Sequence, residues 1–105
     1  GLVMNKTIMA AALVAVMGAP ATADYTVKGS FDCAAAMRED GNEHYREYNK
    51  WWLLGYFTAR NYELQQNVGN GIDDDNIYQM ALSFCQSNPG NDWDDAAIHI
   101  YDLLD

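Results

Sequence analysis

Beyond residue 30, apolar side chains recur every three or four positions, which is the spacing of one face of an α-helix. The pattern predicts a short first helix that begins after Ser30, a residue able to cap it, and runs through Cys33–Met37. Gly41-Asn42 ends this helix. A long second helix is then expected from Glu43 to Asn61, with acidic residues near its positive end.

The second helix carries an unusual amount of aromatic surface. Gly55 lies on its main stripe, where a glycine costs about 1 kcal/mol relative to alanine, so we expect another helix to approach closely there. Trp51 and Phe57 fall outside the stripe, so either this helix is central and buried on two sides or it exposes a patch for a protein partner. The stripe consists of Tyr45, Tyr48, Trp52, Tyr56 and Ala59.

Two further helices complete the predicted all-α fold, a small four-helix orthogonal domain. After a Gly/Asn-rich loop at residues 67–71, a third helix is capped by one of Asp73, Asp74 or Asp75 and ends before Asn88-Pro89-Gly90. A fourth helix begins with Asp92 as its cap. The expected inward residues are Ile77, Met80, Ala81, Phe84 and Cys85 on the third helix and Trp93, Ala96, Ala97, Ile100 and Leu104 on the fourth.

Residues 1–23 have the order of a cleavable signal peptide. Met4 and Lys6 precede a short apolar run, and Ala21-Thr22-Ala23 places small residues before a cleavage point between Ala23 and Asp24. The apolar run is shorter than the roughly 20 residues of a membrane span, although an uncleaved anchor is the alternative. Residues 1–3 are interpreted as upstream read-through or a cloning remnant. The sequence thus predicts an exported, periplasmic protein whose single domain covers residues 24–105.

The charge after cleavage excludes several classes of partner. Five of the 6 basic residues and all 15 acidic residues follow Ala23, so the formal charge becomes −10. Such a surface repels nucleic acid and anionic lipid, and neither nucleic acid nor membrane is expected as a partner of the mature chain. A homodimer that hides one aromatic patch is a further expectation.

Cys33 and Cys85 are the two cysteines of the chain. Export to an oxidising compartment and the even number favour an intramolecular disulfide over a free buried thiol or an intermolecular bridge. On the chain-entropy model this bridge contributes about 4 kcal/mol. It would tie the first helix to the third.

The remaining polar residues give little sign of chemistry. The run Asp73-Asp74-Asp75-Asn76 after flexible glycines suits Ca²⁺ in ligand type, but it lacks the alternating ligands of an EF-hand, so capping and helix-dipole complementarity are the favoured interpretation. His44 and His99 lack metal-binding partners at fixed spacing, and no serine stands in a GxSxG context. We therefore expect no enzyme, no metal site and no cofactor.

Several segments together resemble the HdeA/HdeB-like group of small periplasmic proteins. They are Cys33, the block from Trp52 to Asn61, the motif Phe84-Cys85-x-x-Asn88-Pro89, and a helix containing Ala96-Ala97. The resemblance covers about Phe31 to Leu104. It implies an all-α fold with a Cys33–Cys85 disulfide and the activity of an acid-stress chaperone that binds unfolding clients.

In strong acid the carboxylates become protonated, and five Lys/Arg with two His leave a charge of about +7, which would loosen the domain and expose aromatic side chains. The known chaperones carry many lysines, whereas this chain keeps Lys28 and Lys50 after cleavage. The expected function is therefore a non-enzymatic, acid-responsive, client-binding module of the stress response. Its expected partner-binding residues are Trp51, Trp52, Tyr56 and Phe57.

A weaker resemblance links the Gly55-Tyr56 block with Asn61, and Cys85 with Asn88-Pro89, to immunity proteins. These proteins neutralise peptidoglycan amidases that type VI secretion delivers. The resemblance implies binding to a basic toxin cleft, although that group often has further cysteines.

Overall fold

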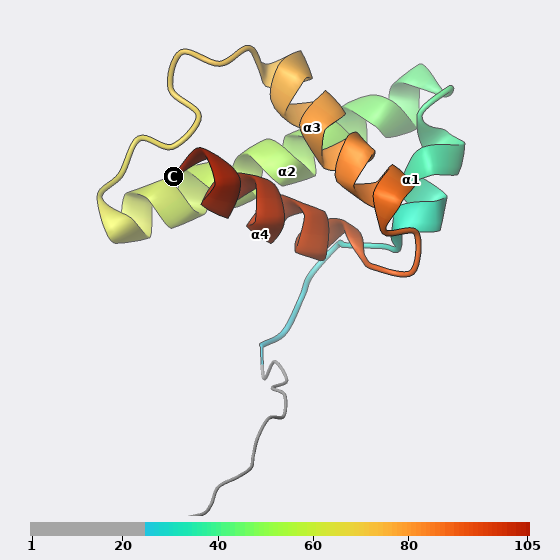
Figure 1. Cartoon of the computed structure of the whole chain (residues 1–105), viewed down its shortest axis with the longest axis horizontal. Coiled ribbons are helices and arrows are strands. Elements are labelled where there is room, and N and C mark those ends of the chain that lie inside the picture. The colour runs from blue at the N-terminus through green and yellow to red at the C-terminus, as the bar shows by residue number, and fades with distance from the viewer. Residues whose placement is uncertain (1–24) are drawn as a thin grey trace, which may run out of the picture.

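A computed structural model describes residues 25–105, and the expected signal peptide lies outside the described residues. Four helices are present there: α1 (Cys33–Glu39), α2 (Glu43–Leu64), α3 (Asp74–Ser87) and α4 (Trp93–Leu104) (Figure 1). No strand occurs among residues 25–105, apart from one isolated bridge between Asp32 and Asp92. The prediction of an all-α domain with four helices is confirmed. Over the same range, no helix has both the length and the apolar character to cross a bilayer.

Helix α2 is the longest of the four, and each of the other helices contacts it. Figure 1 shows α3 and α4 crossing one side of α2, with α1 at the end where α2 begins. The segment between α2 and α3 leaves the far end of α2, where Gln65 has φ 58°, and returns along the helix. Helix α2 therefore runs three residues beyond the expected Asn61, because a left-handed residue ends it only after Leu64.

The start of α1 differs from the prediction that Ser30 caps it. The cap is Asp32, whose Oδ1 accepts a 2.7 Å hydrogen bond from the Ala35 N–H. Ser30 instead serves α4, since its Oγ accepts a 3.1 Å hydrogen bond from the Asp94 N–H. The reason is that the backbone around Phe31 runs beside the start of α4, where the Trp93 N–H donates to the Phe31 carbonyl at 2.8 Å.

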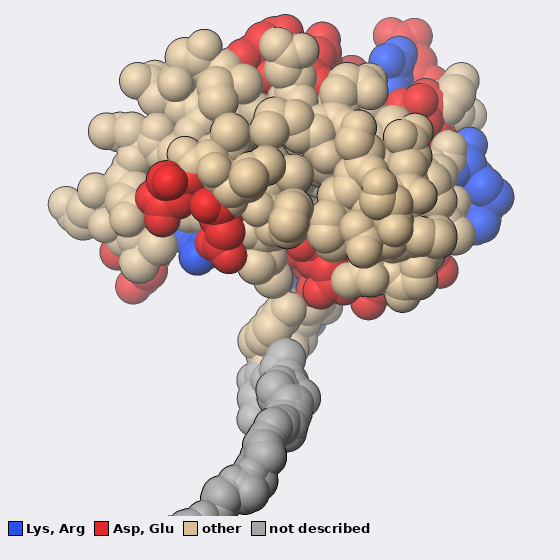
Figure 2. All heavy atoms as spheres, viewed as in Figure 1, with Lys and Arg blue, Asp and Glu red and all other residues tan. Residues whose placement is uncertain are grey.

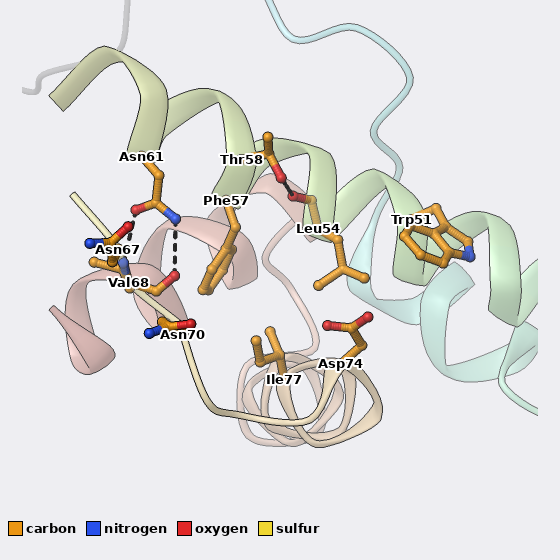
Figure 3. A pocket seen from close by; sticks show the side chains of 11 residues that line it. Trp51, Leu54, Phe57, Thr58, Asn61, Asn67, Val68, Asn70, Asp74 and Ile77 are labelled. Atoms are coloured by element: carbon orange, nitrogen blue, oxygen red, sulfur yellow. Dashed lines mark hydrogen bonds between the residues drawn. The ribbon is translucent and has the colours of Figure 1, made fainter. Parts of the chain in front are cut away.

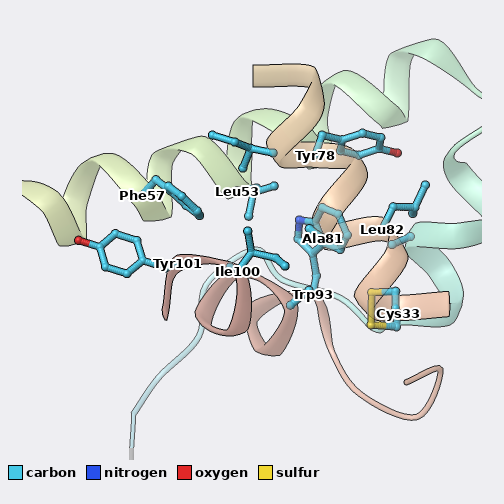
Figure 4. Close-up of a cluster of buried hydrophobic side chains, with 14 residues drawn as sticks. Cys33, Leu53, Phe57, Tyr78, Ala81, Leu82, Trp93, Ile100 and Tyr101 are labelled. Atoms are coloured by element: carbon cyan, nitrogen blue, oxygen red, sulfur yellow. A yellow bond between two sulfur atoms is a disulfide. The ribbon is translucent and has the colours of Figure 1, made fainter. Parts of the chain in front are cut away.

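The core forms around Trp93 and is drawn in Figure 4. The Trp93 indole is fully buried, and its Nε1–H donates to the carbonyl of Asn49 on α2 at 3.1 Å. Most of the expected inward residues of α3 and α4 are buried, but Met80, Phe84 and Leu104 are only half-buried. Three larger side chains that the apolar spacing did not indicate complete the core: Tyr78, Leu82 and Tyr101.

The Cys33–Cys85 disulfide is present and joins α1 to α3. Both residues are fully buried, and their Cα atoms are 5.0 Å apart. Both cysteines are used, so the alternatives of a free thiol and an intermolecular bridge are wrong in this structure.

The prediction for the inner face of α2 is wrong. The buried residues of α2 are Asn49, Leu53 and Phe57, whereas most of the aromatic stripe faces outward. Gly55 is exposed, and a Cβ added to it would meet nothing within 4 Å, so no helix approaches closely there. Spacing identified a helical face correctly, but the contacts of α1, α3 and α4 decide which face is buried.

Candidate functional site

A surface rich in exposed aromatic residues runs along the outer side of α2. At about 100° per residue, its members project within one third of the helix circumference, and they span about 25 Å of axis. Exposed fractions are 50% for Tyr45, 55% for Tyr48, 59% for Trp51 and 80% for Tyr62. We call this surface the aromatic face; it comprises Tyr45, Tyr48, Trp51, Gly55, Ala59 and Tyr62, and all six are exposed.

The structure separates the four side chains that were expected to bind a partner. Trp51 lies on the aromatic face, but Phe57 is a core residue, only 4% exposed. Trp52 and Tyr56 are half-buried and stacked on each other, with ring centroids 6.4 Å apart. The segment before α1 covers Trp52, whose Nε1–H donates to the Lys28 carbonyl at 2.8 Å.

A groove of about 360 Å³ opens beside Trp51, between α2 and the segment that leads into α3 (Figure 3). Leu54, Phe57 and Ile77 contribute apolar surface to it. Figure 3 shows Trp51 at one end of the groove and the side chains of residues 67–70 at the other. The groove is lined by Trp51, Leu54, Phe57, Thr58, Asn61, Asn67, Val68, Gly69, Asn70, Asp74 and Ile77.

Asn61 holds the loop that forms the far wall of this groove. Its amide Nδ2 donates to the Val68 carbonyl, and its Oδ1 accepts from the Val68 N–H, both at 3.0 Å. The hydroxyl of the buried Tyr101 donates to the same Oδ1 at 2.7 Å. Gln66 Oε1, at 3.1 Å, is a second acceptor for this hydroxyl. A loop rich in glycine and asparagine is thus fixed at its centre by one side chain of α2.

Gly69 brings the same loop close to the core. Its φ is +89°, and an added Cβ would lie 3.2 Å from Ile77 Cδ1 and 3.3 Å from Phe57 Cδ2. Glycine is therefore required here both by the backbone conformation and by the close contact.

The three aspartates at the start of α3 have different surroundings. Asp73 is the N-cap residue, and Asp74 and Asp75 lie in the first turn of α3. Asp75 Oδ1 is 2.9 Å from Lys50 Nζ, which also lies 3.1 Å from Glu47 Oε2. Hydrogen bonds to Asp75 and then Glu47 raise the pKa of the Lys50 ammonium. Asp74 forms no ion pair with any residue in the 25–105 range and lines the groove.

Within the described chain, the carboxylates close enough to share a cation are at the start of α4. Oxygens of Asp92, Asp94 and Asp95 all lie within 4.8 Å of one another. Burial, and then the charges of Asp94, Asp95 and Asp32, raise the pKa of Asp92. Two of these groups have structural partners: Asp95 Oδ2 accepts from the Asp92 N–H at 2.9 Å, and Asp94 Oδ1 accepts from Ser30 Oγ at 3.1 Å. Both carboxylates lie at the start of α4, where negative charge interacts favourably with the positive end of the helix dipole.

Carboxylates also link α2 to each of the other helices. Asn49 Nδ2 donates to Glu39 Oε1, at the end of α1, at 3.1 Å. Lys50 pairs with Asp75 of α3, as above. Arg60 lies 2.9 Å from Asp102 Oδ1 of α4. The two ion pairs depend on ionised acidic side chains, whereas a protonated carboxyl could still accept the hydrogen bond from Asn49.

The carboxylates greatly outnumber the basic side chains. On the view that carries α3 and α4, Figure 2 shows acidic groups at several margins around an uncharged centre, with few basic groups. This face of the domain is therefore a surface without charged side chains at its centre, bordered mainly by negative charge.

The histidines lie apart from these features. His44 is exposed in the first turn of α2, and the exposed His99 on α4 packs its ring 4.8 Å from the Phe84 ring centroid.

Sequence reasoning missed Tyr62 as a surface residue, Asn61 as the loop clamp and Asp74 as a groove residue. The signal for Tyr62 was present, because it lies eleven positions after Trp51 and therefore on the same helical side. The other two depend on the path of the loop, which no local pattern indicates. No known family model, curated protein or solved structure matches the chain.

Proposed function

We propose that this chain is a non-enzymatic, periplasmic protein-binding module and that the aromatic face of α2 is its contact surface. The observation that carries the proposal is the exposure of four large aromatic side chains on one side of a helix. Tyrosine and tryptophan supply much of the binding energy of protein interfaces, and soluble monomers rarely expose large contiguous apolar patches.

The more specific proposal is an HdeA-like, acid-responsive chaperone that binds unfolding clients. Its support is the set of carboxylate contacts that join α2 to α1, α3 and α4. At pH 2 carboxylates are protonated, so the two ion pairs are lost and the hydrogen bond to Glu39 loses its charge assistance, while the net charge becomes strongly positive. Exposed ion pairs contribute about 0.2–1 kcal/mol each, and these two pairs are partly exposed, so acid is expected to loosen α2 rather than unfold the whole disulfide-linked domain.

Light scattering tests this proposal. The protein is mixed with a client that aggregates at pH 2–3, and suppression of scattering at near-stoichiometric ratios is the expected result. Unchanged client aggregation would contradict the chaperone function. Near-UV circular dichroism from the three tryptophans, recorded during the same acid titration, reports whether packing loosens.

A second candidate is immunity to a secreted cell-wall amidase. It is favoured by one observation: the aromatic face is already exposed in the folded domain, so a folded partner could bind without acid. The surrounding negative charge would complement a basic toxin cleft. Nanomolar binding at neutral pH to a toxin encoded by a neighbouring gene is the expected result. Without such binding, the immunity function would be wrong.

A further inference from the structure

The groove beside Trp51 combines three kinds of surface that suit one particular side chain. Leu54, Phe57 and Ile77 supply its apolar surface, and polar side chains make up most of the remaining lining. Trp51 borders it with an aromatic ring that is 59% exposed, and Asp74 borders it with a carboxylate (Figure 3). Its volume of about 360 Å³ is at the low end of small-ligand pockets, which matches one or two side chains.

The charges near the groove leave Asp74 available for a partner. Lys50 is the basic side chain nearest in sequence to Trp51, and its ammonium lies 5.8 Å from the Trp51 ring centroid. However, Lys50 pairs with Asp75 and Glu47 and does not line the groove. Asp74 is thus a groove carboxylate without an ion-pair partner among residues 25–105.

We infer that this groove receives an arginine side chain of the partner protein. The aliphatic stem would lie against Leu54 and Phe57. The guanidinium would bind the Asp74 carboxylate and stack on the Trp51 indole, which are the two strongest interactions available to arginine. Asn67 and Asn70, whose amides border the other end, are placed to hydrogen-bond the partner's backbone.

The charge of the whole chain favours this occupant. A formal charge of −9 attracts basic protein surface and repels acidic surface. Because the groove adjoins the aromatic face at Trp51, an arginine anchored here would bring the partner's neighbouring apolar residues onto that face. The inference rests on the proposed function, since it assumes a protein partner. It adds the chemical identity of one partner side chain, an arginine.

Nuclear magnetic resonance titration at pH 7 tests the inference. The purified protein, labelled with ¹⁵N, is titrated with an uncharged-end tripeptide Gly-Arg-Gly and with its citrulline counterpart, which keeps the shape but removes the charge. The arginine peptide should shift the Trp51 indole N–H and the Asn67 and Asn70 side-chain amides. Its affinity should exceed that of the citrulline peptide by about tenfold, a difference expected for a charge-assisted bond.

Two variants separate the groove from general charge attraction. Asp74→Asn removes the groove carboxylate and should weaken arginine-peptide binding about tenfold. Glu63→Gln removes one exposed charge from α2 outside the groove and should leave binding within a factor of two. Equal shifts with the citrulline peptide, equal losses in both variants, or no shifts at these resonances would overturn the inference. The aggregation assay at pH 2–3 is independent of this result, so the two proposals can fail separately.

Discussion

Replacing Asn61 with alanine should strongly destabilise the domain, although Asn61 is only half-buried. The change removes two hydrogen bonds to Val68, at 3.0 Å each, and the 2.7 Å bond from the buried Tyr101 hydroxyl. Each such bond contributes about 0.5–1.5 kcal/mol net, and Tyr101 keeps Gln66 as an alternative acceptor. The expected loss in free energy of unfolding is therefore about 2–3 kcal/mol.

Urea unfolding followed by tryptophan fluorescence measures this loss, and thermal unfolding should show a decrease in Tm of about 10–20 °C for a domain of this size. Asn67→Ala is the matched control. It removes an exposed amide that forms no side-chain hydrogen bond with the described residues, so its expected effect is below about 0.5 kcal/mol. Similar losses in the two variants would refute the assignment of Asn61 as the loop clamp.

Three further predictions concern stability. Gly55→Ala should raise the free energy of unfolding by about 0.5–1 kcal/mol in urea titrations, because an exposed helical glycine with nothing within 4 Å has no packing role; a loss would show a contact that the structure lacks. Reducing Cys33–Cys85 with dithiothreitol should cost about 4 kcal/mol, and an unchanged urea midpoint would contradict the stabilising role of the bridge. Asp92→Asn should raise the urea midpoint at pH 7 but not at pH 2. The pKa of Asp92 is raised in the folded state, so the ionised carboxylate opposes folding at pH 7 and the protonated one does not. A higher midpoint of the variant at pH 2 would contradict this reasoning.

Local signals predicted the helices well. Gly41-Asn42 marks the end of α1, Asn88-Pro89 the end of α3 and Asp92 the start of α4. Such start and stop signals act on the backbone within a few residues. The even number of cysteines and the expected export of the chain were enough to predict the pairing of Cys33 with Cys85. These features require no knowledge of which elements meet.

Long-range contacts account for what the sequence did not predict. On α2 the outward stripe is richer in aromatic residues than the inward set, and the polar Asn49 interrupts that inward set. Nothing local shows that Asn49 packs beneath Trp93, a residue 44 positions later. Ser30 was misassigned for the same reason, since its partner Asp94 is 64 positions away.

The candidate site was predicted only in part. Of the two interpretations left open, an exposed patch requires Trp51 on the surface, and Trp51 is exposed. Phe57, however, is a core residue, and the segment before α1 covers Trp52. The groove depends on a loop whose position is fixed by Asn61 and Gly69. That dependence explains why Asp74 could be interpreted from sequence only as part of a helix start.

The most direct test of the central claim compares client binding with and without the aromatic face. Trp51→Ser combined with Tyr62→Ser removes two exposed aromatics, and Leu103→Ser, on α4 and 62% exposed, is the control for lost apolar surface elsewhere. In the light-scattering assay at pH 2–3, the wild type and the control should suppress client aggregation equally, whereas the double variant should fail to do so despite an unchanged Tm at pH 7. Full suppression by the double variant would show that the aromatic face of α2 is not the binding surface.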